Sequence, residues 1–284
     1  MFVRRAFALF LIGLLGVVAA TPEPVAAQGP SVEALREAAG SYVRSAFPRL
    51  ANLVATESYT QQLRRPGGVL MGRQPRRLRS EVLLVPHPAE PQNWLFFRDV
   101  LEVNGKAVPN HQDRLNTLFL TPTAANWELV REIAHADRQY HIAGGTVAEA
   151  NPFVMFALID RAYWPRLTFS RGREDKDVAP GVWTLLIDEL PSNETPLLTA
   201  ARARGTVWVD AATGRILQTE LRLDDDFGGA TSRTRFRYDE TLMVTVPVEM
   251  RTAWRPQRTT LVQGTAKYSN FRRFTVRTEE SLKQ

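Results

Sequence analysis

The four histidines of the chain, His87, His111, His135 and His141, are its first candidates for metal or acid–base chemistry. His135 and His141 are six residues apart in a segment with helical spacing, which places them on opposite sides of a helix. No H-E-x-x-H pattern occurs and the chain has no cysteine, so a metal site would need scattered histidines and carboxylates. The sequence therefore predicts no metal site.

Two glycine-rich stretches imitate ligand-binding motifs. Residues 67–74 read GGVLMGRQ and lack the Lys and Ser/Thr that follow the last glycine of a phosphate loop. Asp224-Asp225-Asp226 precedes a glycine pair, but a calcium loop has a different spacing and a terminal Glu. No G-x-S-x-G sequence is present to seat a nucleophilic serine. The sequence therefore predicts no catalytic residue and no cofactor, and the protein is expected not to be an enzyme.

A regular hairpin pattern is the clearest structural signal of the chain. Residues 205–223 read GTVWVDAATGRILQTELRL, in which Asp210 can accept bonds from the backbone after it and Gly214 supplies a positive φ. Alternation then divides the second strand into two faces. One face is expected to hold Leu217, Thr219, Leu221 and Leu223, and the other Ile216, Gln218, Glu220 and Arg222.

The same alternation continues in the strands that follow. Phe236 and Tyr238 alternate with arginines, and the next strand repeats the design with Val246, Val248, Met250 and Trp254. Consecutive strands with one apolar face and one basic, wet face indicate an antiparallel sheet lined on one side. Strands are expected over 54–63, 78–84, 94–103, 166–171, 181–190, 205–210, 214–223, 232–239, 244–254 and 260–277.

Local signals indicate turns, a bulge and a first helix. Asn104-Gly105 favours a tight hairpin turn because both residues tolerate positive φ. Ser269-Asn270 interrupts the alternation of the last strand and predicts a bulge. Ser31 is expected to cap an amphipathic helix that runs to about Phe47, just before Pro48.

The middle of the chain has the pattern of helices. One is expected from Thr121 to about Tyr140 and another over 153–164, each entered through a proline. The second is apolar on nearly every side, so it must be covered on nearly every side. We expect it inside the concavity of the sheet, either as permanent core or as a lid over an apolar ligand. The residues expected to line that cavity are Phe153, Phe156, Ile159, Phe236, Tyr238, Val246, Val248, Met250 and Trp254.

The N-terminus has the pattern of a secretory signal peptide. Arg4-Arg5 precedes an uncharged run over 6–20, followed by small-residue cleavage sites that end at Ala20 and Ala27. The run of 15 residues is shorter than the roughly 20 that a membrane-spanning helix needs, although an uncleaved anchor is the alternative. We therefore expect an exported protein, periplasmic or secreted, with no transmembrane segment after cleavage. The lack of cysteine fits a bacterial periplasm better than a disulfide-dense secretome.

The formal net charge is +6 at pH 7, and the basic excess gathers late in the chain. The residues are Arg233, Arg235, Arg237, Arg251, Arg255, Arg258, Lys267, Arg272, Arg273 and Arg277. A basic surface can bind nucleic acid, anionic lipid headgroups or acidic polymers, or it can be only the solvated face of a sheet. Export disfavours nucleic acid, so no nucleic-acid partner is expected.

Four motifs follow one another in the second half: GTVWVD at 205–210, TGRIL at 213–217, VPVEM at 246–250 and GTAKYSNF at 264–271. This order resembles the periplasmic lipoprotein-carrier superfamily of the outer-membrane lipoprotein-sorting type. The order of elements is similar over about 31–277 and the motifs over about 205–273. The resemblance implies a half-barrel, a curved antiparallel sheet with helices packed on its concave side. It also implies an acyl chain or a lipoprotein as ligand, and no cofactor.

These signals predict an α+β fold in a single domain over 28–284, after a signal peptide over 1–27. The expected function is that of an exported, non-catalytic binding protein that carries or senses an apolar or lipid ligand in the cell envelope. The alternative is an envelope structural or interaction module that binds a protein partner and no small ligand. A large apolar cavity would favour the first and a filled interior the second, whereas clustered buried carboxylates or histidines would favour an enzyme.

Overall fold

The computed structural model of the chain describes residues 29–51, 53–65, 67–71, 74–86, 94–109, 131–132, 135–136, 138–142, 150–191, 196–198, 201–224, 229–257 and 260–273. The expected signal peptide over 1–27 and most of the expected helix over 121–140 lie outside these ranges.

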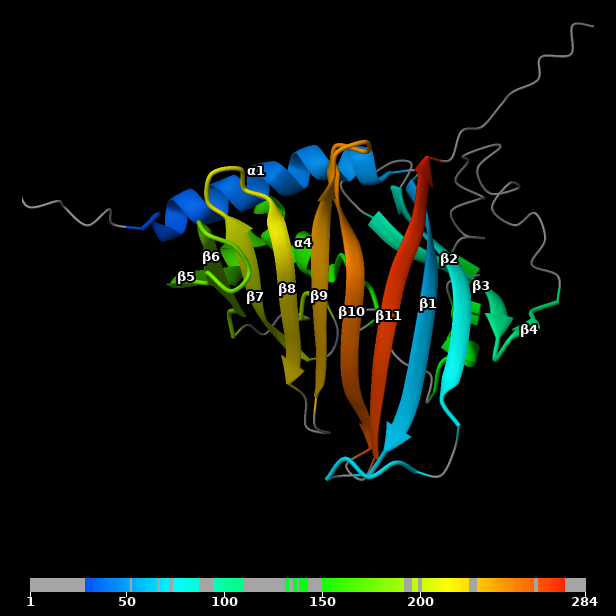
Figure 1. Cartoon of the computed structure of the whole chain (residues 1–284). Coiled ribbons are helices and arrows are strands. Elements are labelled where there is room, and N and C mark those ends of the chain that lie inside the picture. The colour runs from blue at the N-terminus through cyan, green and yellow to red at the C-terminus, as the bar shows by residue number, and fades with distance from the viewer. Residues whose placement is uncertain are drawn as a thin grey trace, which may run out of the picture.

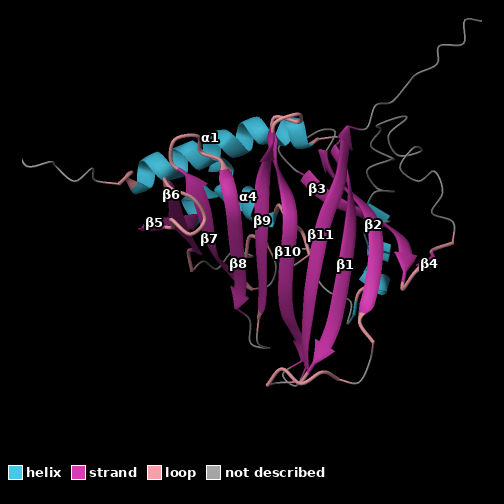
Figure 2. Cartoon of the chain, in the orientation of Figure 1, coloured by secondary structure: helices cyan, strands magenta, loops and turns pink. Residues whose placement is uncertain are grey.

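Eleven strands form one antiparallel sheet (Figures 1 and 2). They are β1 (Leu53–Arg64), β2 (Arg76–Pro86), β3 (Trp94–Val103), β4 (Lys106–Ala107), β5 (Leu167–Glu174), β6 (Val182–Glu189), β7 (Arg202–Asp210), β8 (Ile216–Asp224), β9 (Ala230–Asp239), β10 (Val244–Gln257) and β11 (Thr260–Arg273). Their order across the sheet is β4-β3-β2-β1-β11-β10-β9-β8-β7-β6-β5. The chain thus enters the middle of the sheet, runs out to β4, and returns from the far edge until its last strand pairs with its first.

Helix α1 (Val32–Leu50) lies across one end of the strands (Figure 1). It begins as predicted, because the Ser31 hydroxyl accepts a hydrogen bond from the Ala34 amide at 3.1 Å. It continues through Pro48 to Leu50 and buries one stripe of small and apolar residues on the sheet. In the parts of the chain that the structure describes, no helix has the length and hydropathy of a membrane span.

One face of the sheet, here called the inner face, packs against α1 and against the short helix α4 (Val154–Ile159). Helix α1 contacts β5 through Arg36, whose guanidinium lies 5.4 Å from the Phe169 ring, and β3 through Phe47, whose ring stacks on Trp94 at 4.7 Å. On a flat sheet nine strand spacings of about 4.8 Å, some 43 Å, would separate β3 from β5, whereas 19 residues of helix measure about 28 Å. These contacts agree with a sheet that curves toward the helix, and the α+β fold with helices on one face of an antiparallel sheet is confirmed.

The predicted turns and the bulge in the last strand are confirmed. The Asp210 carboxylate accepts from the amides of Ala212 and Thr213 at 2.9 and 3.3 Å, and Gly214 has a φ of 71°. Asn104 and Gly105, between β3 and β4, have φ values of 53° and 78°. Pairing of β1 with β11 shifts register beside Asn270, which has a φ of 53°.

The predicted faces of β8 are wrong at its first two residues. Ile216 was expected on the wet face but is fully buried in the core, whereas Leu217 is half-buried. The register of β7 and β8 shifts at this point, so that Ile216 pairs with Val209 and the next pair is Trp208 with Gln218. Leu217 is the additional residue of a bulge, and a bulge reverses the alternation before it.

The expected helix over 153–164 is two shorter helices. Helix α4 ends at Ile159, and the 3₁₀ helix η3 (Arg161–Arg166) follows. Between them Asp160 has extended backbone, with a ψ of 137°, and its carboxylate accepts from the Ala162 amide at 2.9 Å. Asp160 is therefore an N-cap rather than an interior residue, because its side chain bonds to backbone that a continuous helix would use itself.

Gly214→Ala is expected to lower the free energy of unfolding by about 2–4 kcal/mol. Alanine is strained at the positive φ of this position, and its Cβ would also clash with a neighbour. A Cβ at this position would lie 2.3 Å from the Ala38 carbonyl oxygen of α1, which is backbone and cannot rotate away. Gly181→Ala is the matched control, because Gly181 has a φ of 77° but a Cβ added there would meet no neighbour within 4 Å. In urea unfolding, the control should lose only about 1 kcal/mol of the free energy of unfolding. Equal losses in the two variants would mean that the turn is not in close contact with α1.

Candidate ligand site

Three of the aromatic residues predicted to line a cavity come together between α4 and β9. The Phe153 and Phe156 rings lie 5.5 Å apart, and the Phe236 ring lies 5.2 Å from Phe156 and 6.0 Å from Phe153. Phe47 of α1 adds an edge contact to Phe156 at 6.4 Å. Edge-to-face and tilted contacts of this kind are favourable pairs within a core. The inner face beside α4 is therefore filled by side chains.

The remaining predicted lining residues are distributed through the core. Ile159, Val246 and Met250 are fully buried and Trp254 nearly so, whereas Tyr238 and Val248 are half-buried. Tyr238 is covered by Arg215, whose guanidinium carbon lies 3.5 Å from the ring centroid. In β10 the register shifts between Pro247 and Glu249, so that Pro247 rather than Val246 or Val248 is opposite Phe236.

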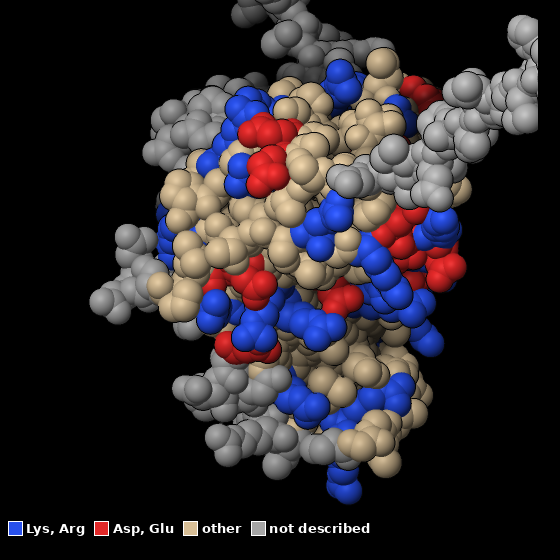
Figure 3. All heavy atoms as spheres, turned by 90° about the vertical axis from the view of Figure 1, so that its left-hand side faces the viewer, with Lys and Arg blue, Asp and Glu red and all other residues tan. Residues whose placement is uncertain are grey.

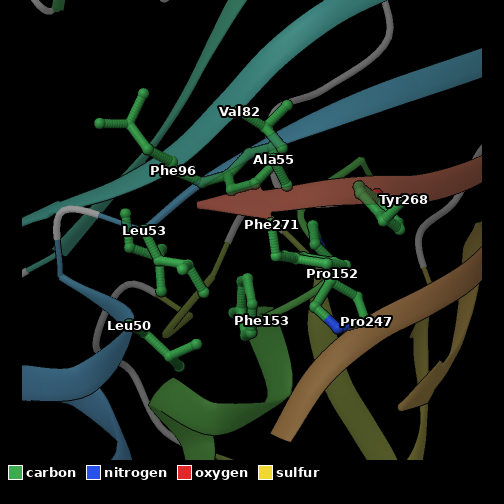
Figure 4. Close-up of a pocket in the computed structure, with 12 residues that line it drawn as sticks. Leu50, Leu53, Ala55, Val82, Phe96, Pro152, Phe153, Pro247, Tyr268 and Phe271 are labelled. Carbon is green, nitrogen blue, oxygen red and sulfur yellow. The ribbon is translucent and has the colours of Figure 1, made fainter. Parts of the chain in front are cut away.

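An apolar cleft opens at the C-terminal end of α1 (Figure 4). Its walls come from α1 and β1, from β2 and β3, from the segment before α4, and from β10 and β11. The lining residues are Leu50, Leu53, Ala55, Val82, Leu83, Leu84, Phe96, Pro152, Phe153, Pro247, Tyr268 and Phe271. Phe153 alone belongs both to this lining and to the predicted set, so it stands between the cleft and the filled interior.

The cleft encloses little space. Its cavity volume is about 20 Å³, and one buried water already requires about 10–15 Å³. The Tyr268 hydroxyl is the only polar side-chain group of a lining residue. The cleft can therefore receive the end of an apolar group, and a longer chain requires movement of the wall.

A buried ion pair lies on the inner face next to the cleft. The Arg98 guanidinium of β3 donates to both carboxylate oxygens of Glu57 of β1, at 2.6 and 2.9 Å. Its Nη2 also donates to the Ala150 carbonyl oxygen at 2.8 Å, shortly before α4. The Glu57 side chain is fully buried and that of Arg98 is 6% exposed. Strand register places this pair beside the cleft, since Val82 is opposite Arg98 and Tyr268 is opposite Glu57. Ala55 in turn pairs with Val82 from the other side of β2.

Further polar groups continue from this pair along the inner face. The Tyr59 hydroxyl and Thr252 Oγ1 share a hydrogen bond of 2.8 Å. The Gln61 amide bonds to His141 Nδ1 and to the Ile142 backbone amide, both at 2.9 Å. Burial raises the pKa of Tyr268 well above its ordinary value, and the nearby charge of Glu57 acts in the same direction. We call Glu57, Tyr59, Gln61, Arg98, His141 and Tyr268 the inner polar cluster.

The sequence carries a signal for the ion pair of this cluster, although Glu57 and Arg98 were not among the expected site residues. Glu57 stands between Ala55 and Tyr59 at the period of a strand, and Arg98 stands between Phe96 and Val100 in the same way. A carboxylate and a guanidinium on the buried, apolar faces of nearby strands can be accommodated only if they form an ion pair, because burying an unpaired charge is costly. Within the described residues, no group of three or more acidic or histidine side chains is placed to hold a metal ion.

The sequence matches no protein-family model and no curated protein. Among solved structures, the chain is similar to a DUF1329 family protein from Desulfovibrio piger, at 13% identity over 87% of this chain and 94% of that one, with a TM-score of 0.37. It is similar to a putative outer membrane lipoprotein-sorting protein domain from Vibrio parahaemolyticus, at 13% identity over 88% and 94%, with a TM-score of 0.38. Lipovitellin aligns with 81% of this chain over 26% of its own, at 7% identity and a TM-score of 0.25.

Likeness at this level does not say what a chain binds, because one fold can hold many unrelated functions. What this protein binds has to follow from the cleft and from its surfaces.

Proposed function

We propose that residues 28–284 form one exported, non-catalytic domain that binds an apolar group, such as an acyl chain, in the cell envelope. The single observation that supports this is the cleft at the end of α1, whose walls are apolar apart from one tyrosine hydroxyl. Each methylene buried there contributes about 0.8 kcal/mol. Periplasmic localisation and the signal peptide over 1–27 remain part of the proposal.

Phe153 is the residue that decides how deep a ligand reaches. It lines the cleft and contacts the Phe156 and Phe236 rings behind it. A rotation of Phe153 away from the cleft would extend the small cavity toward the Phe156 and Phe236 rings. The acyl chain of the ligand would then take the place of the Phe153 ring against Phe156 and Phe236. The apolar surface of the interior would stay covered.

The chemistry of the inner polar cluster supports a non-catalytic role. Both carboxylate oxygens of Glu57 are occupied by the Arg98 guanidinium, and His141 Nδ1 is bonded to Gln61. A general base has to lie within hydrogen-bond reach of a substrate proton. Only Tyr268 of this cluster borders the cleft, and its raised pKa keeps the hydroxyl neutral.

Titration with a fluorescent fatty acid tests the proposal. We expect saturable binding to the wild type, several-fold tighter binding to Phe153→Ala, and loss of binding to Ala55→Phe, which fills the cleft. Phe169→Ala is the matched control: Phe169 is a half-buried phenylalanine of β5 that packs on Trp164, away from the lining residues. Binding to this variant should equal that of the wild type, and thermal unfolding should verify that Ala55→Phe is folded.

The second candidate is an envelope interaction module without a small ligand, which the small volume of the cavity favours. Absence of saturable binding in both the wild type and Phe153→Ala would refute the first candidate and leave the second. Equal tightening by Phe153→Ala and Phe169→Ala would also refute it, because the effect would then come from general loosening of the core.

A further inference from the structure

The outer face of the sheet, opposite α1 and α4, carries a cluster of arginines. Thr234 and Phe236 of β9 are buried on the inner side, so Arg233 and Arg235 project outward. With Arg251 they surround an open groove of about 280 Å³, which Gln218 and Glu249 complete. We call these five residues the outer arginine groove.

Strand register places like charges together in this groove. Arg233 is directly opposite Arg251 on the neighbouring strand, an arrangement that costs stability. Glu249 is shared, at 2.9 Å from Arg251 Nε and 3.6 Å from Arg235 Nη2. On β8, Glu220 lies directly opposite Arg233 and pairs with Arg222. The three guanidinium groups of the groove therefore face two carboxylates, Glu249 within the groove and Glu220 at its edge.

Arg233 also contacts two uncharged side chains. Its guanidinium lies 5.4 Å from the centroid of the Trp208 ring. The Gln218 amide, oriented with its oxygen toward Arg233, accepts from Nη2 at 2.8 Å and from Nε at 3.3 Å. These two contacts hold the guanidinium in place and add no negative charge to it. The groove thus has a preorganised positive excess that an external anion can satisfy.

The positive charge extends over a plane. Outward basic side chains come from four adjacent strands, β8 to β11: Arg222, Arg233, Arg235, Arg237, Arg251 and Lys267. These strands span about 15 Å. Three acidic side chains of the same strands, Glu220, Asp239 and Glu249, pair with Arg222, Arg237 and Arg251, so the plane is mixed with more basic than acidic side chains. Basic and acidic side chains are also interspersed on the side that carries β5 and β6 (Figure 3).

We propose that the outer arginine groove docks the protein onto a membrane surface that contains anionic phospholipids. A guanidinium group can donate two parallel hydrogen bonds to the oxygens of one phosphate. The Arg235 and Arg251 side chains are 59% and 70% exposed, so they can reach headgroups at a membrane surface. Glu249 lies inside the groove and repels a single compact anion there, which favours a distributed array of phosphates. This docking uses the face opposite the cleft and does not rest on apolar ligand binding.

Co-sedimentation with vesicles tests the docking. We expect the protein to bind phosphatidylcholine vesicles that contain phosphatidylglycerol, not to bind phosphatidylcholine alone, and to be released by salt. Arg233→Gln with Arg251→Gln should weaken binding about 25-fold, at about fivefold per charge. The control, Lys106→Gln with Lys176→Gln, removes the same charge from exposed residues near opposite ends of the sheet and should leave binding within about twofold.

Glu249→Gln separates docking from a structural role of the groove. This variant removes the repelling carboxylate, so it should strengthen binding to the anionic vesicles about fivefold. The proposal is overturned by no preference for anionic vesicles, by equal weakening in the control, or by weaker binding of Glu249→Gln. Displacement by inorganic phosphate or by polyglutamate at matched ionic strength would also overturn it, since it would identify a compact anion or an acidic polypeptide as the partner.

Discussion

Arg98→Met is expected to lower the free energy of unfolding by about 3–5 kcal/mol. The substitution leaves the fully buried Glu57 carboxylate without its guanidinium partner and removes the donor to the Ala150 carbonyl oxygen. A buried unpaired charge costs more than the pair itself contributes. Urea unfolding followed by circular dichroism measures the loss.

A second variant distinguishes the unpaired charge from lost packing. Glu57→Gln combined with Arg98→Met removes both charges and should regain most of the stability, because replacing a whole buried pair is often close to neutral. The coupling energy follows from the cycle of single and double variants. If the double variant were less stable than Arg98→Met by the full cost of Glu57→Gln, the two side chains would be energetically independent and this account would be wrong.

Leu221→Asp is expected to destabilise the protein by several kcal/mol, because it buries a carboxylate without a partner. Leu221 is 1% exposed and lies opposite Gly205 and Ser232 on the neighbouring strands. None of these neighbours carries a positive charge that could compensate. The melting temperature and the urea midpoint should both fall sharply.

Glu220→Lys at the preceding position is the matched comparison. The Glu220 side chain lies on the outer face and pairs with the exposed Arg222, and such pairs contribute about 0–1 kcal/mol. Its substitution should therefore change stability by no more than about 1 kcal/mol. Similar melting temperatures for Leu221→Asp and Glu220→Lys would contradict the assignment of faces in β8.

Regular parts of the fold could be predicted because their signals are local. Alternation from Thr219 to Leu223 needs only neighbouring residues, and so do the Asp210 turn and the Ser31 cap. The bulges at Leu217 and Val248 could not be placed in this way, because a bulge is defined by pairing with a partner strand. A single extra residue then moved Ile216 from the expected wet face into the core.

The cleft could not be predicted from the sequence for a different reason. Its walls combine Leu50 and Leu53 with Phe96, Phe153 and Phe271, which meet only after the whole sheet has formed. The sequence correctly marked Phe153 and Phe156 as apolar on a helix that must be covered. It left open whether these rings form permanent core or a lid, and it did not indicate that the open space lies at the end of α1.

The pairing of β1 with β11 has a consequence for the time course of folding. This pairing joins Leu53 to Arg273, which are far apart in the sequence, so β1 and β10 cannot be joined in one sheet until β11 has formed between them. Before then, β1 to β4 and β5 to β10 are two separate meanders, each with an unpaired edge. Contacts between such distant residues slow folding, and unpaired edges favour association with other chains. The two meanders therefore expose β1 and β10 as edges until β11 pairs with both strands.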